Sequence, residues 1–392
     1  MPLTLPEPDE REQEHSRRLC DRIAAAIGRG DGWIPFSRYM EMALYEPGLG
    51  YYLAGRQKFG AAGDFVTAPE ISPLFSRALA HQCAEVLRLQ SSVACVLELG
   101  AGSGVMAAEM LAELERLDCL PDHYYILELS AELARRQRET LQRRVPHLAG
   151  SVRWLHSLEG LSLHGVIVAN EVLDAMPVCR FEQSADALHL LGVGLDAGRF
   201  VWRRRPADEA VMAAVARLRP AGDGWPEGYR SEYNPRLGPW LRMLSDHLAS
   251  GAIVLIDYGY PRGEYYHPQR GDGTLLCHYR QRATEDPFWY PGLQDITASV
   301  DFTAVAEAGT EAGLALSGYT SQAWFLLANG LETLYQQALE GADERTRLML
   351  SKQIKLLTLP AEMGERFQVI GFSRGIEAPL RGFVLQDFSQ RL

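Results

Sequence analysis

Short, largely apolar runs alternate with stretches of helical periodicity through the middle of the chain. The runs at Val93–Leu99 and Gly165–Ala169 have the composition of buried parallel strands. Apolar residues recur at helical spacing over Gly104–Leu117 and Ala131–Arg144. The other strands expected in the same sheet are Tyr124–Leu129, Val152–His156 and Gly251–Asp257. This order indicates βαβ units and predicts an α/β fold with a Rossmann-like parallel sheet.

Helices are predicted to dominate the regions on either side of this sheet. Those expected before it are Glu12–Ile27, Phe36–Tyr45 and Ser72–Leu89, and those expected after it are Phe302–Ala312, Ala323–Leu339 and Ala342–Leu357. Two strand-like pieces follow at Phe367–Phe372 and Gly382–Gln386. The sheet is interrupted by hairpin-like strands within Cys179–Arg204 and by helices at Ala207–Arg219 and Pro235–Ser250.

These patterns predict three regions. Residues 1–90 form an N-terminal helical and loop extension that contributes to the active site. Residues 91–178 and 251–392 form the sheet core with helical insertions, and residues 179–250 form an inserted region for a substrate or partner. Two segments rich in glycine and poor in periodicity, Gly60–Glu70 and Tyr258–Gly292, are predicted to be irregular loops near the site.

The net charge of the chain limits the classes of partner that we expect it to bind. It carries 39 basic and 50 acidic residues, a formal charge of -11, so its surface repels nucleic acid and suits a cationic substrate. Six scattered cysteines without a CxxC pair argue against a disulfide framework and against a metal site. No apolar run approaches the roughly 18 residues of a membrane span, and the N-terminus lacks the apolar core of a signal peptide. We therefore expect a cytoplasmic protein with no membrane partner.

The strongest chemical signal is the glycine-rich segment Glu98–Gly104, which follows a strand and opens a helix. Its glycines, Gly100, Gly102 and Gly104, let a ligand approach the backbone closely. Val105 stands where a dinucleotide fingerprint needs another glycine. The spacing therefore favours a nucleoside with an amino-acid tail over a pyrophosphate.

Two acidic residues complete this pattern. Glu128 ends the next strand, where a carboxylate can accept both ribose hydroxyls. Glu98 precedes the glycines and suits the ammonium of a methionyl group. Together these residues describe a binding site for S-adenosyl-L-methionine. The alternative is a turn that only lets a helix pack on the sheet, with Glu128 as a charge at a helix start.

A second group of polar residues, Asn170, Glu171 and Asp174, follows the fourth strand. If the chain is helical from Val172, Glu171 and Asp174 share a face and could clamp a guanidinium beside the methyl donor. Alternatively, these residues cap and charge a helix N-terminus. Asp257, at the end of the fifth strand, is either a third acid at the same sheet edge or an ordinary turn aspartate.

Several motifs occur in the order seen in a known family. They are Tyr45–Tyr52, Gly63–Ser72, Glu98–Gly104, Asn170–Glu171, Asp174–Pro177, Asp257–Gly259, Pro291–Thr297, Val300–Phe302 and Met363–Val369. With these motifs the chain resembles the MidA-type class I methyltransferases from about Ile34 to Gly371. Mitochondrial members of that family assist assembly of respiratory complex I.

The resemblance implies a seven-stranded fold with S-adenosyl-L-methionine as cofactor and S-adenosyl-L-homocysteine as product. It also implies symmetric dimethylation of an arginine, the activity of mitochondrial members. It carries the family's glycine loop onto Gly100, Gly102 and Gly104, and its acid after the second strand onto Glu128. The loop departs from the family at Ala101 and Ser103, where members often have Pro and Arg.

In this light the segment Gly63–Ser72 becomes a candidate lid. Asp64 and Glu70 are polar groups among apolar neighbours, and we expect them to fold over the donor pocket and exclude water. The alternative is a purely structural loop.

The predicted function is protein arginine N-methylation, with Glu171 and Asp174 orienting the guanidinium and Asn170 beside them. The alternatives are a small-molecule or RNA methyltransferase on the same fold, and an assembly factor or binding protein that keeps a donor-binding fold. The expected partner is a protein that presents an arginine, and a homodimer is a further option.

Overall fold

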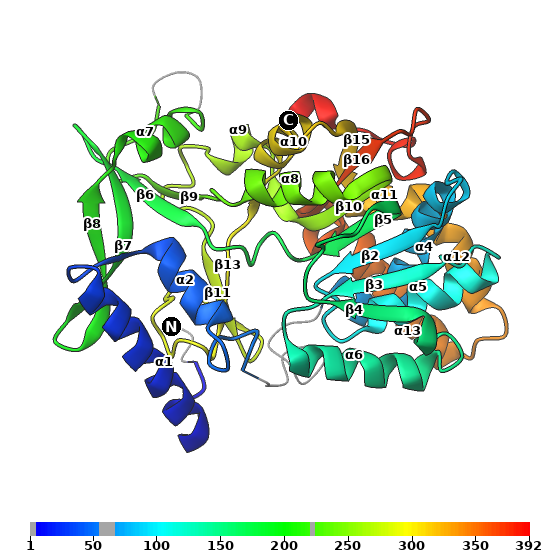
Figure 1. Cartoon of the computed structure of the whole chain (residues 1–392), viewed down its shortest axis with the longest axis horizontal. Helices are drawn as coiled ribbons and strands as arrows, with labels where there is room; N and C mark the ends of the chain where they lie inside the picture. Colours follow the sequence, from blue (N-terminus) through cyan, green and yellow to red (C-terminus); the bar gives the residue numbers. More distant parts are fainter. Residues whose placement is uncertain (1–4, 55–66, 220–223) are drawn as a thin grey trace. The chain divides into compact units, whose positions relative to one another are not determined.

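The structure is a computed structural model that describes residues 5–54, 67–219 and 224–392. The chain forms two compact units, coloured along the sequence in Figure 1. The first comprises Met1–Phe65, Leu173–Leu237 and Tyr260–Asp301, and the second comprises Val66–Val172, Gly238–Gly259 and Phe302–Leu392. Each unit is therefore assembled from three separate segments.

The second unit is built on seven strands in the order β15-β16-β10-β5-β2-β3-β4. These are β2 (Cys95–Leu99), β3 (His123–Leu127), β4 (Val152–Leu155), β5 (Leu163–Asn170), β10 (Leu248–Tyr260), β15 (Ala315–Ser321) and β16 (Phe367–Arg374). Neighbours from β4 to β10 are parallel, and β16 is antiparallel to both of its neighbours. The predicted α/β fold with a Rossmann-like sheet is confirmed; among the described residues the sheet has an eighth strand, the short β14 (Val300–Asp301), which pairs with β10 outside this order.

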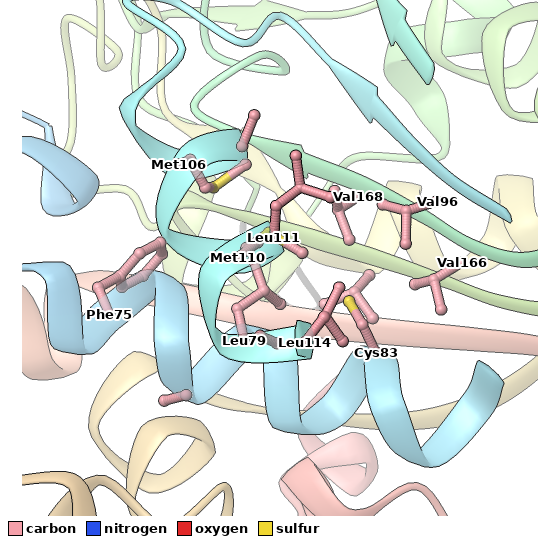
Figure 2. Close-up of a cluster of buried hydrophobic side chains, with 14 of the residues drawn as sticks. Phe75, Leu79, Cys83, Val96, Met106, Met110, Leu111, Leu114, Val166 and Val168 are labelled. Atoms are coloured by element: carbon pink, nitrogen blue, oxygen red, sulfur yellow. The ribbon is translucent and has the colours of Figure 1, made fainter. Parts of the chain in front are cut away.

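Helices α4 (Pro73–Arg88) and α5 (Val105–Arg116) bury apolar side chains against this sheet. Figure 2 shows side chains of both helices gathered beside valines of β2 and β5. Ser72 caps α4 by accepting a hydrogen bond from the Leu74 N–H (3.3 Å). Helix α6 (Ala131–Arg144) begins as the sequence predicts. This packing fixes the ends of the parallel strands, where the site residues lie.

Four helices follow in the C-terminal part of the second unit. They are α10 (Phe302–Glu311), α11 (Gln322–Ala328), α12 (Leu331–Leu339) and α13 (Glu344–Thr358). The single helix predicted over Ala323–Leu339 is wrong, because the chain breaks at Gly330, whose φ of +85° is left-handed.

The strand predicted at Gly382–Gln386 is also wrong. Residues Arg381–Phe383 form a 3₁₀ turn instead. The ring of Phe383 packs against the sheet over two glycines, Gly318 and Gly371. A Cβ on Gly318 would lie 2.3 Å from the Phe383 side chain, and a Cβ on Gly371 would lie 2.4 Å from it. The strand that completes the sheet is β15, which the sequence analysis missed.

The first unit contains two small sheets. One has the order β1-β7-β6-β9 with β8 on β7, and the other has the order β12-β11-β13. Their strands are β1 (Ile34–Pro35), β6 (Cys179–Gln183), β7 (Leu188–Asp196), β8 (Arg199–Pro206), β9 (Arg230–Tyr233), β11 (Leu276–Tyr279), β12 (Arg282–Thr284) and β13 (Asp295–Thr297). Helices α1 (Glu10–Arg29) and α2 (Phe36–Tyr45) pack with them through a common apolar core.

The segment Tyr258–Gly292 is more regular than predicted, because it holds the short helix α9 (Arg262–Tyr265) and the β11–β12 hairpin. The insertion has the predicted hairpin strands, with helix α7 (Glu209–Ala216) after them and α8 (Leu237–His247) later. Across the described residues, no helix has the length and apolar character needed to cross a membrane.

Candidate functional site

The glycine loop joins β2 to α5 in a conformation that needs glycine. Gly100, Gly102 and Gly104 have φ values of +66°, +52° and +80°. A Cβ on Gly100 would lie 3.0 Å from Val172 Cγ2, and one on Gly104 would lie 2.9 Å from Gln137 Cα. The loop therefore runs closely against its neighbours and leads into the N-terminus of a 12-residue helix, whose first amides favour a negatively charged group.

We expect Gly104→Ala to lower the free energy of unfolding by about 2 kcal/mol, measured by urea denaturation. About half of this comes from the left-handed φ, and the rest from the contact with Gln137. Gly160→Ala is the matched control, because Gly160 has a φ of +75° but nothing within 4 Å of its added Cβ. Equal losses in the two variants would show that the contact with α6 contributes nothing.

Glu128 lies at the carboxyl end of β3, beside the glycine loop. The parallel pairing of β2 with β3 places Leu99 opposite Leu127, so the loop and Glu128 leave the sheet at the same edge. Glu128 is buried, and its carboxylate accepts hydrogen bonds from Ser130 N–H (2.8 Å) and from Gln137 Nε2 (2.8 Å). The carboxylate is therefore held in one orientation.

Gln137, which the sequence analysis missed, links these two parts. Its Nε2 also donates to the carbonyl oxygen of Gly102 (3.1 Å). The sequence signal was weak, because a glutamine among the arginines of α6 resembles an ordinary exposed polar residue, as Gln142 of the same helix is.

Glu98 is fully buried beneath the loop. Its Oε2 accepts a hydrogen bond from the Tyr124 hydroxyl (2.6 Å), and no described residue supplies a partner for Oε1. Burial raises the pKa of Glu98 to about 7; the Tyr124 hydrogen bond opposes this and the charge of Glu128 adds to it. A cation placed at Oε1 would stabilise the ionised form of this buried carboxylate.

Glu70, in the short helix α3 (Ala68–Ile71), contacts the glycine loop directly. Its Oε1 accepts a hydrogen bond from the Ser103 hydroxyl. Asp64, the other acid of the candidate lid, lies outside the described residues. The lid itself stays a prediction.

Glu171 follows β5 in a strained turn. Its φ of +53° is left-handed, which is uncommon for a residue with a side chain and is often found at functional sites. The Glu171 N–H donates to the Ile256 carbonyl (2.9 Å), and the Asn170 Nδ2 donates to Glu171 Oε1 (3.0 Å). Among the described parts of the chain, the buried Oδ1 of Asn170 has no partner.

Asp257 holds this turn from the neighbouring strand. It is fully buried, and its carboxylate accepts hydrogen bonds from Val172 N–H (3.1 Å) and Tyr258 N–H (2.9 Å). Asp257 therefore fixes the backbone next to Glu171.

The chain is not helical from Val172, so Glu171 and Asp174 do not share a helical face. The left-handed φ of Glu171 and the hydrogen bond from Val172 N–H to Asp257 hold the backbone in a turn. Asp174 belongs to the first unit, where it is buried and its carbonyl accepts from the Ala298 N–H (3.0 Å).

Other motif residues of the first unit gather around two partly buried tyrosines, Tyr45 and Tyr52. The Tyr52 hydroxyl lies 3.0 Å from each carboxylate oxygen of Asp295, and the Tyr45 hydroxyl donates to the Ala175 carbonyl (3.0 Å). The two rings stack with centroids 5.4 Å apart. Burial, followed by the charge of Asp295, raises the pKa of Tyr52 well above its usual range, so its hydroxyl stays protonated as a donor.

Three kinds of similarity agree with this geometry. Residues 78–320 match a family model described as "Putative S-adenosyl-L-methionine-dependent methyltransferase". The mitochondrial protein arginine methyltransferase NDUFAF7 of Danio rerio is 27% identical over 385 residues, which cover 90% of this chain and 85% of that protein. Its Homo sapiens counterpart is 27% identical over 375 residues, which cover 86% of this chain and 80% of that protein.

Among solved structures, a Burkholderia thailandensis protein bound to S-adenosyl-homocysteine has a TM-score of 0.94 and 47% sequence identity. That match covers 99% of this chain and 100% of the other. A native structure from the same organism has a TM-score of 0.91 and 46% identity, with 99% and 100% covered.

Proposed function

This chain belongs to the family of S-adenosyl-L-methionine-dependent methyltransferases, and from that premise we propose that it methylates an arginine side chain of a protein. One observation carries the proposal. The glycine loop, Glu128 and Glu171 follow the three adjacent parallel strands β2, β3 and β5, at one edge of the sheet. Relatives from two vertebrates are named protein arginine methyltransferases, which supports arginine as the acceptor.

The residues of this edge fit the donor. Side chains at Gly100 and Gly104 would run into Val172 and Gln137, so glycine at both positions keeps the loop in its close-packed, left-handed conformation at the start of α5. We assign Glu128 to the ribose hydroxyls and the Oε1 of Glu98 to the donor's ammonium, since it has no partner among the described residues. When bound, S-adenosyl-L-methionine supplies a methyl group that its sulfonium already activates.

Glu171 and Asn170 are assigned to the acceptor. A guanidinium presents planar N–H donors that match a carboxylate, and Asn170 Nδ2 already fixes one oxygen of Glu171. Glu171 holds the attacking nitrogen in line with the methyl carbon and stabilises the positive charge of the guanidinium. Asp174 is proposed as a second acid for the acceptor, and Glu70 as the residue that anchors the lid segment to the loop through Ser103.

The test is mass spectrometry of a cell lysate incubated with the enzyme and isotopically labelled S-adenosyl-L-methionine. We expect labelled methyl groups on arginine residues of a small number of proteins, and symmetric dimethylarginine after acid hydrolysis. The same lysate without enzyme is the control. Label found only in RNA, in small molecules or on residues other than arginine would contradict arginine as the acceptor.

A further inference from the structure

The side chain of Gln137 lies fully buried at the meeting point of three elements of the second unit. Its Nε2 donates to Glu128 Oε2 (2.8 Å) after β3 and to the Gly102 carbonyl (3.1 Å) in the glycine loop. Its Oε1 accepts a hydrogen bond from the indole N–H of Trp154 (2.9 Å) on β4. One amide thus connects both parts of the proposed donor site to a third strand.

The chemistry of these partners leaves the amide only one orientation. A carbonyl oxygen and an ionised carboxylate can only accept hydrogen bonds, so both must face the NH₂ group. The indole N–H can only donate, so it must face the oxygen. Because Gly104 has no Cβ, the backbone of Gln137 can approach the loop closely enough to make these contacts.

We propose that Gln137 is a positioning residue for the methyl donor, which locks the Glu128 carboxylate in the orientation that receives the ribose hydroxyls. This inference rests on the proposed function, because it takes Glu128 as the ribose acid. Without the Gln137 amide, Glu128 keeps the hydrogen bond from Ser130 N–H to Oε1 but loses the one that fixes Oε2. The orientation of the carboxylate is then less tightly fixed, and binding must restore it at a cost in affinity.

Charged groups around this amide come from several elements. Glu98 on β2 acts on Glu128 through its charge, and the His156 ring nitrogen Nδ1 lies 3.2 Å from the Glu128 carbonyl. The guanidinium of Arg138 lies over the Trp154 ring, 4.4 Å from its centroid. Glu128 is the acid that Gln137 contacts directly, so a charge introduced at position 137 acts first on Glu128.

The test compares two ligands by isothermal titration calorimetry: S-adenosyl-L-homocysteine, and its analogue in which hydrogens replace both ribose hydroxyls. We expect Gln137→Met to weaken S-adenosyl-L-homocysteine binding about tenfold, the effect of one hydrogen bond to a charged group, and to weaken binding of the analogue much less. Gln142→Met is the matched control, because Gln142 is exposed on the same helix. Trp154→Phe removes the N–H partner of Gln137 but keeps the Gln137 amide, and it should weaken the same ligand selectively by a smaller factor.

A second readout uses pH. Gln137→Glu places a carboxyl against Glu128, and repulsion between the two groups at that distance raises the pKa at which the second of them ionises. Relative to the wild type at each pH, S-adenosyl-L-homocysteine affinity should fall at about pH 8 and recover at about pH 5, where the pair shares a proton. Gln142→Glu adds the same charge and should show no such recovery.

The outcomes separate this inference from the proposed function. If the wild type does not bind S-adenosyl-L-homocysteine, the proposed function fails and the inference fails with it. If the wild type binds it more tightly than the analogue, but Gln137→Met and Trp154→Phe weaken both ligands equally, only the inference is overturned. In that case Gln137 acts on the fold and not on the ribose.

Discussion

Replacing Glu171 with glutamine is expected to lower the rate of methyl transfer to an arginine peptide by about a hundredfold or more. Glutamine keeps the size of the side chain and can accept from Asn170 Nδ2, but it cannot stabilise the positive guanidinium. Affinity for S-adenosyl-L-homocysteine should change little, because donor binding is assigned to the glycine loop, Glu98 and Glu128. Transfer is measured with radiolabelled donor, and donor binding by calorimetry.

The strained backbone at Glu171 provides a control that separates activity from stability. Glycine tolerates a φ of +53°, so Glu171→Gly should raise the free energy of unfolding by about 1 kcal/mol while abolishing transfer. Asp118→Gly is the matched variant, since Asp118 is exposed in the same unit with a φ of +49°. It should gain similar stability with full activity. A Glu171→Gln variant with wild-type rates would remove Glu171 from the catalytic assignment.

The parallel part of the sheet could be predicted because burial on both faces leaves continuous apolar runs. β5 and β10 read clearly for this reason, and helix α6 has the predicted bounds. β15 could not be predicted, because its sequence, ALSGYTS, has small and polar residues around Leu316 and Tyr319 and no continuous apolar run. Phe383, an apolar residue distant in sequence, packs over its glycine. The apolar residues of the Phe383 segment made that segment resemble a strand.

Site residues could be predicted where their spacing along the chain determines their geometry. They could not be predicted where a contact between residues distant in sequence determines it. The glycine loop and Glu128 follow from a strand–loop–helix pattern that the parallel register brings to one edge. The turn at Glu171 depends on Asp257, which accepts a hydrogen bond from the Val172 amide 85 positions earlier, and no local pattern reveals a contact at that separation. The sequence predicts a negatively charged Glu98, but burial raises its pKa to about 7 and keeps the carboxyl largely protonated below that pH.

That burial gives the second large expected effect, a loss of stability between pH 4.5 and about 7. Glu98 has an ordinary pKa of 4.5 and a folded-state pKa of about 7. In this window the folded chain keeps a proton that the unfolded chain releases, so the stabilisation is present below pH 4.5 and lost as pH rises. The full change is about 3 kcal/mol. Denaturant unfolding at a series of pH values measures it.

Glu98→Gln should remove this pH dependence and be about 3 kcal/mol more stable than the wild type above pH 7, because a neutral amide can still accept from Tyr124 without carrying a buried charge. The same variant tests the donor assignment. If the ammonium of S-adenosyl-L-homocysteine pairs with Glu98, binding near pH 7 ionises the carboxyl and releases a proton. Calorimetry in two buffers of different ionisation heat detects that proton, and the glutamine variant should not release it. Equal pH slopes in wild type and variant would show that Glu98 does not titrate in this window, and equal proton release would show that the ammonium binds elsewhere.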